Sequence, residues 1–189
     1  GSSDAAATLW GLNRIYQTDF STARLRELAA QLGSDVPFFL TGGAALGLGR
    51  GEKIESWETP STYWLVLVKP PEGLSTPQVY QSGKAVLTSG DRARNFREVL
   101  TQGDPRKLAD QLYNGLEPAA FYLLPRVESL KNSLLAAGAC GALVSGSGPT
   151  VLGLASDEET AYRLAEKMKP QADFVRVAPT VSEGPRIIS

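Results

Sequence analysis

The sequence contains no histidine and only one cysteine, Cys140. Without histidine, catalysis by a Ser-His-Asp triad or a Cys-His pair is excluded, as are metal sites that depend on imidazole. A single cysteine cannot form an intrachain disulfide, nor can it build a multi-cysteine zinc or iron–sulfur site, and this usage suits a reducing compartment. Any chemistry must therefore come from carboxylates, hydroxyls, cations and backbone groups.

An excess of either charge and a long apolar run are also missing. Lys and Arg together number 19 and Asp and Glu 20, which gives a formal net charge of −1. This balance argues against nucleic acid or an anionic membrane surface as the main partner and favours a small molecule. The longest apolar run, residues 64–68, is too short to cross a bilayer. At 189 residues and 42% hydrophobic side chains, the chain can bury a core as one large domain or two small ones.

The stretch from Gly33 to Gly43 places a carboxylate between a helix and a glycine-rich strand. Apolar residues at helical spacing predict a helix over 21–32, ended by Gly33 in the left-handed conformation. Asp35 precedes Val36-Pro37 and is therefore predicted to be the N-cap of a short second helix, which would fix its carboxylate in space. An ordinary capping aspartate without catalytic role is the alternative interpretation.

The chain opens on Gly1-Ser2-Ser3-Asp4 followed by three alanines, directly before a helical pattern. Ser2 and Ser3 are natural N-caps, and Asp4 suits the positive end of the helix dipole. Such a helix start can bind phosphate, while the alanines allow another backbone to come close. The alternative is an expression-derived Gly-Ser followed by an ordinary alanine-rich helix.

A polar linker with a proline, residues 58–62, predicts a boundary between domains 1–60 and 61–189. In the first domain, strands are expected over 44–51 and 53–58. In the second, the expected elements are a strand at 63–68, a short helix capped by Ser75, helices at 93–102 and 105–113, a long helix at 118–137, strands at 142–144 and 150–154, a helix begun by a Ser156/Glu159 capping box, and a strand at 174–178. Without the small helices this is the order β-α-β-β-α-β, so the predicted class is α+β with a ferredoxin-like second domain.

Familiar nucleotide and nucleophile motifs fail on inspection. A dinucleotide fingerprint would need a third glycine at Glu52 or Val151, and the one Gly-Lys pair, at 83–84, lacks the Ser or Thr of a P-loop. What remains is one carboxylate, one serine-rich helix start, and glycine-rich turns at 42–51 and 145–149. This set suits phosphoryl transfer, in which positioning and backbone electrostatics dominate, although each glycine turn alone is commonly just a turn.

Three segments, taken in order, resemble the GHMP kinases, the family of galactokinase, homoserine kinase, mevalonate kinase and phosphomevalonate kinase. Residues 1–6 resemble the end of the family's glycine-serine ATP-binding motif, and residues 145–150 resemble its third, glycine-rich motif. Gly33-Ser34-Asp35-Val36-Pro37-Phe38-Phe39, with 47–52, is most similar to the member that acts in the non-mevalonate route to isoprenoid precursors. The three motifs span nearly the whole chain.

The resemblance implies transfer of phosphate from ATP, with Mg²⁺, to the 2-hydroxyl of 4-diphosphocytidyl-2-C-methyl-D-erythritol. In this resemblance Asp35 is the catalytic aspartate that orients the hydroxyl and takes its proton. Gly1, Ser2 and Ser3 fall on the ATP-binding loop, and Gly146, Ser147 and Gly148 fall on the substrate loop that closes over the site. No residue of the chain is assigned as a metal ligand. The implied location is a bacterial cytoplasm or a plastid stroma.

In the resembled family, a catalytic lysine and most of the phosphate loop precede the segment that matches Gly1. We therefore expect the N-terminal portion of the same enzyme as a partner, and no turnover by these 189 residues alone. Two alternatives stay open: a non-catalytic metabolite-binding or regulatory module, and another GHMP kinase such as homoserine kinase. Asp35 favours a kinase over a binding module, because a carboxylate beside a phosphate-binding helix start would repel an anionic ligand.

Overall fold

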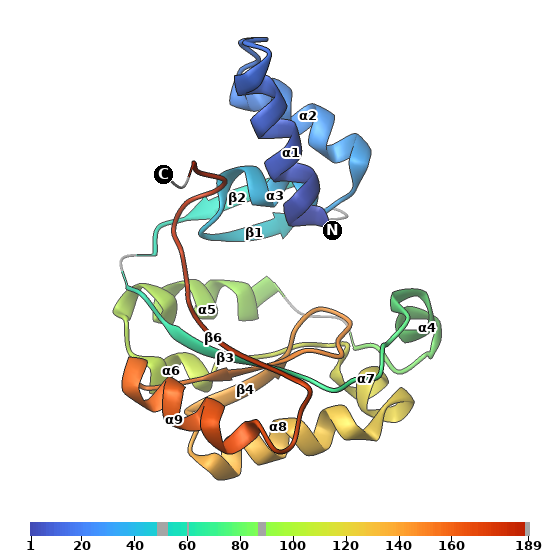
Figure 1. Ribbon diagram of the computed structural model, residues 1–189, viewed down its shortest axis with the longest axis vertical. Helices are drawn as coiled ribbons and strands as arrows, with labels where there is room; N and C mark the ends of the chain where they lie inside the picture. Colours follow the sequence, from blue (N-terminus) through green and yellow to red (C-terminus); the bar gives the residue numbers. More distant parts are fainter. Residues whose placement is uncertain (49–52, 60, 87–89, 188–189) are drawn as a thin grey trace. The chain divides into compact units, whose positions relative to one another are not determined.

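The computed structural model describes residues 1–48, 53–59, 61–86 and 90–187 and divides into two compact units (Figure 1). Unit 1 consists of Gly1–Thr59 with Val181–Ser189, and unit 2 of Pro60–Thr180. The division near residue 60 coincides with the polar linker. The C-terminal tail differs from the expected domain 61–189, because its residues pack within unit 1.

Unit 1 is built from three helices and a two-stranded antiparallel sheet. The helices are α1 (Ser2–Ile15), α2 (Thr22–Leu32) and α3 (Val36–Thr41), and the strands are β1 (Ala44–Leu48) and β2 (Lys53–Trp57). Its small core joins Ala6 of α1, Ala29 of α2 and Val36 of α3. The expected continuation of β1 to Gly51 lies outside the described residues.

Helix α2 begins as predicted, because the Ser21 hydroxyl accepts a hydrogen bond from the Arg24 N–H. Its end differs from the prediction. Gly33 has a φ of 169°, which is extended backbone that any residue adopts, and not the left-handed cap. The chain leaves the helix in this extended form and turns at once, with the Val36 N–H donating to the Gly33 carbonyl.

The glycines after α3 let the tail come close. Gly42 and Gly43 both have φ of +71°, and a Cβ on Gly42 would lie 2.2 Å from the backbone of Glu183. A Cβ on Gly184 would in turn lie 2.5 Å from the Leu40 carbonyl oxygen. The backbone that comes close at Gly42 is thus the protein's own tail.

Unit 2 contains a four-stranded antiparallel sheet in the order β4-β5-β3-β6. The strands are β3 (Trp64–Lys69), β4 (Gly141–Val144), β5 (Val151–Leu154) and β6 (Phe174–Pro179). Helices α8 (Pro125–Ala137) and α9 (Glu158–Met168) pack against it, as Figure 1 shows. The predicted β-α-β-β-α-β order and the α+β class are confirmed.

The core of unit 2 lies between the sheet and these two helices. It is made of small and medium-sized apolar side chains that are almost fully buried, namely Val66, Val68, Ala120, Val127, Leu130, Leu134, Ala142, Val144, Val151, Ala155, Ala161, Leu164, Ala165, Met168, Ala172 and Val175. Burial of this many side chains is the main stabilising contribution in unit 2.

The single helix predicted over 118–137 is wrong: the structure has α7 (Glu117–Leu123) and then α8. Leu124 separates them with φ −143° and ψ 86°. The residue before a proline is disfavoured in the helical region, and Pro125 lacks the N–H that a continuous helix would need. Gly138 ends α8 in the left-handed conformation that glycine favours at this position, with a φ of 109°.

Unit 2 also contains α4 (Thr76–Gln81), α5 (Gly90–Gln102) and α6 (Pro105–Ala109). Asp104 caps α6 by accepting hydrogen bonds from two N–H groups, whereas Ser75 precedes α4 without a side-chain cap. The predicted Ser156/Glu159 capping box is wrong. Asp157 is the cap, because its carboxylate accepts from the Thr160 N–H while Ser156 donates to Asp157. Within the described ranges, no helix is both long and apolar enough to span a membrane.

Candidate functional site

Asp35 occupies the position before α3 that the sequence predicts, but its side chain does not cap the helix. Its backbone is already helical, with φ −88° and ψ −14°, whereas a capping residue is normally extended. The second helical residue is Pro37, which has no N–H to donate. The predicted fixing of the carboxylate by a cap bond is therefore wrong. Asp35 is exposed and makes no hydrogen bond or ion pair with the described residues.

The Asp35 side chain instead lines a solvent-open pocket of about 340 Å³ within unit 1. The other lining residues come from α3 and from both strands of the small sheet: Phe38, Phe39, Ala45, Gly47 and Ile54. The two phenylalanine rings meet edge to face, with centroids 5.2 Å apart. Among the described residues, the pocket thus offers a carboxylate without a partner beside a largely apolar wall, an arrangement in which a ligand hydroxyl can find an acceptor.

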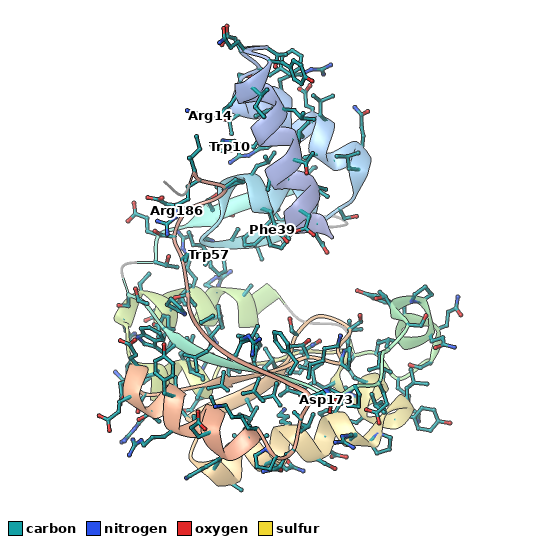
Figure 2. All side chains as sticks on the ribbon, in the orientation of Figure 1. Trp10, Arg14, Phe39, Trp57, Asp173 and Arg186 are labelled. Carbon is teal, nitrogen blue, oxygen red and sulfur yellow. The ribbon has the colours of Figure 1, made fainter. Side chains whose placement is uncertain are left out.

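The start of α1 packs against α3, the helix that follows Asp35. Ala6, in the second turn of α1, is fully buried in the same cluster as Val36, the residue after Asp35. Phe39 packs on that cluster and points toward the beginning of α1 in Figure 2. The sequence predicts that the alanines at the start of α1 let another backbone come close, and in the structure α3 packs there.

Gly1, and not Ser2 or Ser3, is the N-cap of α1, and no side chain caps this helix. The prediction of serine caps is therefore wrong, because both serines already belong to the first turn. Their hydroxyls make no hydrogen bond with the described residues, so they and the first-turn N–H groups are available to a ligand. Asp4 lies in the first turn as expected.

The predicted substrate loop lies between β4 and β5 in unit 2. Gly146 and Gly148 have φ of +56° and +81°, a region that glycine adopts without strain. A Cβ on Gly146 would meet nothing within 4 Å, whereas one on Gly148 would lie 3.2 Å from Leu74 and from Val144. Gly148 is therefore required by the packing of unit 2, and Gly146 is the glycine that leaves space open. Ser147 shares a hydrogen bond of 2.8 Å with the Thr76 hydroxyl of α4.

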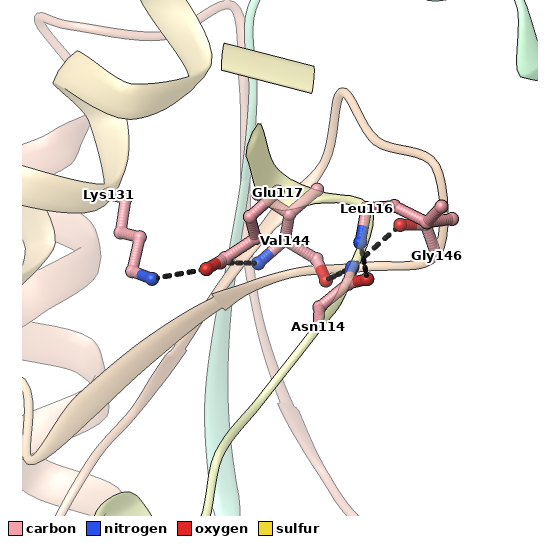
Figure 3. Close-up of polar contacts among 6 residues, drawn as sticks. All are labelled: Asn114, Leu116, Glu117, Lys131, Val144 and Gly146. Atoms are coloured by element: carbon pink, nitrogen blue, oxygen red, sulfur yellow. Dashed lines mark hydrogen bonds and ion pairs between the residues drawn. The ribbon is translucent and has the colours of Figure 1, made fainter. Parts of the chain in front are cut away.

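A polar network behind the loop was missed by the sequence reasoning (Figure 3). The side-chain amide of Asn114 donates to the carbonyls of Val144 and Gly146, at 2.7 Å each. The Glu117 carboxylate accepts from the Val144 N–H at 2.9 Å and pairs with Lys131 at 2.7 Å. The only sequence signal was the Asn114-Gly115 pair, a turn signature that says nothing about contacts 30 residues away.

Two further side chains have shifted pKa values without belonging to this site. Burial raises the pKa of the Cys140 thiol, which disfavours the thiolate that nucleophilic chemistry needs. Burial likewise raises the pKa of Tyr63, whose hydroxyl donates to the Leu100 carbonyl. Among the described residues, no three His, Cys, Asp or Glu side chains gather in a way that could hold a metal ion.

Comparison with known proteins decides the family. The profile described as the GHMP kinases N terminal domain matches residues 1–43, and the profile described as GHMP kinases C terminal matches residues 95–172. The chain belongs to the GHMP kinase family. Asp35 and the start of α1 fall within the first match, and the network around Asn114 falls within the second.

Curated relatives in this family agree over almost the whole chain. The chain is 45% identical over 181 residues to the 4-diphosphocytidyl-2-C-methyl-D-erythritol kinase of Pelotomaculum thermopropionicum, covering 95% of the chain and 63% of the relative. It is 39% identical to the protein of the same name from Bacillus subtilis, covering 97% and 63%. The chain thus spans about three fifths of the length of these GHMP kinases.

Solved structures share the fold. A crystal structure of 4-(cytidine 5'-diphospho)-2C-methyl-D-erythritol kinase matches 97% of the chain and 65% of its own, with a TM-score of 0.74 and 30% identity. Homoserine kinase from Cytophaga hutchinsonii matches the same shares with a TM-score of 0.78. At 19% identity, the second likeness shows the fold alone.

Proposed function

We propose that this chain carries the catalytic carboxylate and the glycine-rich loop of an ATP-dependent small-molecule kinase. The proposed reaction is phosphorylation of the 2-hydroxyl of 4-diphosphocytidyl-2-C-methyl-D-erythritol, in the non-mevalonate route to isoprenoid precursors. The observation that carries the proposal is the unpaired Asp35 carboxylate in the unit 1 pocket, beside the start of α1. The names of the relatives at 39–45% identity support this substrate over homoserine.

In this proposal, Asp35 accepts a hydrogen bond from the substrate hydroxyl and takes its proton as the oxygen attacks the terminal phosphate. A carboxylate that is exposed and has no partner in the described part of the chain can turn toward an incoming alcohol. The edge-to-face pair of Phe38 and Phe39 lines the same pocket and gives the bound alcohol an apolar surface to rest against. Asp35 therefore orients the nucleophile.

The start of α1 fits an ATP phosphate in chemistry. Gly1, Ser2 and Ser3 offer N–H groups at the start of α1, which no side chain caps, together with two serine hydroxyls. ATP would supply the transferable phosphoryl group. Mg²⁺ is commonly held by the nucleotide phosphates with only one or two protein carboxylates, so a dedicated cluster of metal ligands is not required. The similar proteins named above come from bacteria, which favours a bacterial cytoplasm over a plastid stroma.

The decisive experiment joins this chain to the part of the Bacillus subtilis relative that lies outside the match. The fusion should release ADP from Mg-ATP only when the diphosphocytidyl substrate is present, and not with homoserine. Asp35→Asn in the fusion should lower kcat by about 10²–10⁴-fold, because positioned proton transfer is worth that much. The KM for ATP should change little.

Asp19→Asn is the matched control, since Asp19 is an exposed aspartate of the same unit, beyond the far end of α1. Half of wild-type kcat in the Asp35 variant would contradict the catalytic role. Faster turnover of homoserine than of the diphosphocytidyl compound would contradict the proposed substrate. We expect no turnover by the 189-residue chain assayed by itself, and substrate-dependent ADP release in that assay would show that its own phosphate-binding groups suffice.

A further inference from the structure

Asn114 is placed to control the shape of the glycine-rich loop from behind. Its NH₂ group lies between two carbonyl oxygens, those of Val144 at the end of β4 and Gly146 on the loop, at 2.7 Å each. Its own oxygen accepts the Leu116 N–H at 2.8 Å. The amide is therefore satisfied on both sides, and its orientation follows from the network, because the opposite assignment would set oxygen against two carbonyls.

Two backbone N–H donors of the loop take no part in the hydrogen bonds of the described residues. The Ser145 N–H donates to the Thr150 carbonyl, and the Gly148 N–H donates to the Ser145 carbonyl. The N–H groups of Gly146 and Ser147 have no partner among the described residues. In a trans peptide the C=O and N–H point in opposite directions. Because the Gly146 carbonyl points at Asn114, the Ser147 N–H points away from it.

We propose that Asn114 is a positioning residue that holds the Gly146–Ser147 peptide so that the Ser147 N–H donates to a phosphate oxygen of a bound ligand. This rests on the proposed kinase function, which supplies two phosphate-bearing ligands: the diphosphate of the cytidyl substrate and the triphosphate of ATP. Backbone N–H groups at a glycine-rich turn suit such an oxygen, and the open space around Gly146 leaves room for it. The Thr76 hydroxyl holds the Ser147 side chain from the α4 side.

Only an amide side chain of this length meets the requirement. An aspartate has the same shape but would set a carboxylate against two carbonyl oxygens, and an alanine would leave both carbonyls without their donor. In either variant the Gly146–Ser147 peptide can rotate, because a glycine at 146 restricts ψ little. Misplacement of about 1 Å is enough to lower a rate by about 10²-fold.

The ligand part is tested on the 189-residue chain by amide NMR with ¹⁵N label. Addition of CDP or of ATP, in separate titrations, should shift the Ser147 amide signal, and the ligand that does so at lower concentration identifies the source of the phosphate. A Ser147 signal unmoved by both, while other residues respond to either ligand, would overturn the proposed contact.

The positioning part is tested with Asn114→Asp and Asn114→Ala against Asn132→Asp, an exposed asparagine of α8. In both Asn114 variants, the Kd obtained from the titration of the Ser147 amide signal should rise by about tenfold or more, as expected for a lost hydrogen bond to a charged group. The control should bind as wild type does. Folded variants with unchanged Ser147 binding would overturn the role, and so would failure of both variants to fold, because Asn114 would then serve stability alone.

Kinetics of the fusion separate this inference from the function itself. Asn114→Asp should lower kcat by about 10²-fold, with little change in the KM for ATP, if the loop contacts the substrate. An inactive wild-type fusion whose Ser147 amide still binds CDP would contradict the kinase and keep the loop contact. An active fusion that is insensitive to Asn114→Asp would keep the kinase and reject the positioning role.

Discussion

The two units of this chain differ in how they are held together. Unit 2 has a continuous core between a four-stranded sheet and two helices, and the glycine loop is tied to that core by side chains from α7 and α8. Unit 1 has a cluster of three buried residues and a two-stranded sheet. Both units leave large apolar side chains exposed, among them Ile15 at 73% in unit 1 and Tyr122 at 65% in unit 2.

The difference shows where stability and proposed chemistry lie. The loop of unit 2 is joined to the strands of the core and held by hydrogen bonds from Asn114, and two of its residues are glycines in the left-handed conformation. Asp35 of unit 1 precedes a six-residue helix, and its side chain makes no hydrogen bond with the described residues. We therefore expect the loop to be preorganised and the Asp35 carboxylate to be oriented by what binds in its pocket.

The largest effect on stability is expected from a cavity in the core of unit 2. Leu134 is fully buried, and its side chain fills the space above Gly153, where a Cβ would lie only 2.8 Å away. Leu134→Ala should lower the free energy of unfolding of unit 2 by about 2–5 kcal/mol, because a packed sheet cannot collapse into the gap. Hydrogen exchange followed residue by residue measures this loss.

Leu25→Ala in α2 is the matched change in unit 1, at a side chain 5% exposed. Its cost should fall at the lower end of the same range, since the sparse core of unit 1 can relax around it. Exchange in unit 2 should stay unchanged in the Leu25 variant. Equal losses in both units from either variant would show that they unfold together and would remove the contrast.

A smaller effect is expected from the two loop glycines. Gly148→Val should destabilise unit 2 by about 1–3 kcal/mol, because its side chain would crowd Leu74 and Val144 in a left-handed backbone. Gly146→Val should cost less, since open space surrounds it. Thermal melts of the two variants measure the difference. In the active fusion, Gly146→Val should nevertheless lower turnover. Normal turnover would show that Gly146 serves only to form the turn and not to leave space for a ligand.

The smallest effect concerns acid. Hydrogen bonds from the Thr160 N–H and then from the Ser156 and Thr160 hydroxyls lower the pKa of Asp157 below its ordinary value of 3.8. A carboxylate with a lowered folded-state pKa adds stability above its ordinary pKa and loses it as the pH falls through the folded value. In the Asp157→Asn variant, the melting temperature of unit 2 should therefore fall less steeply as the pH is lowered into the acid range. Asp173→Asn, at an exposed position, is the control, and a similarly reduced fall there would contradict the assignment.

Local signals predicted most of the elements. Serine before α2, proline after Asp104 and glycine after α8 mark helix ends through backbone rules that act over a few residues. The same rules erred where two signals competed. The apolar stripe across 118–137 hid the break at Pro125, and the serines of the chain's first turn looked like caps although Gly1 takes that position.

The sequence by itself determined the family motifs, the α+β class with its ferredoxin-like strand order, and the exclusion of histidine and multi-cysteine chemistry. Only the tertiary structure decided that Asp35 lines a pocket without a capping bond, that the tail covers Gly42, and that Asn114 holds the loop. Each of these depends on residues that are distant in the chain or on side-chain orientation. Periodicity and capping rules carry no information about such contacts, because they describe neighbours along one element.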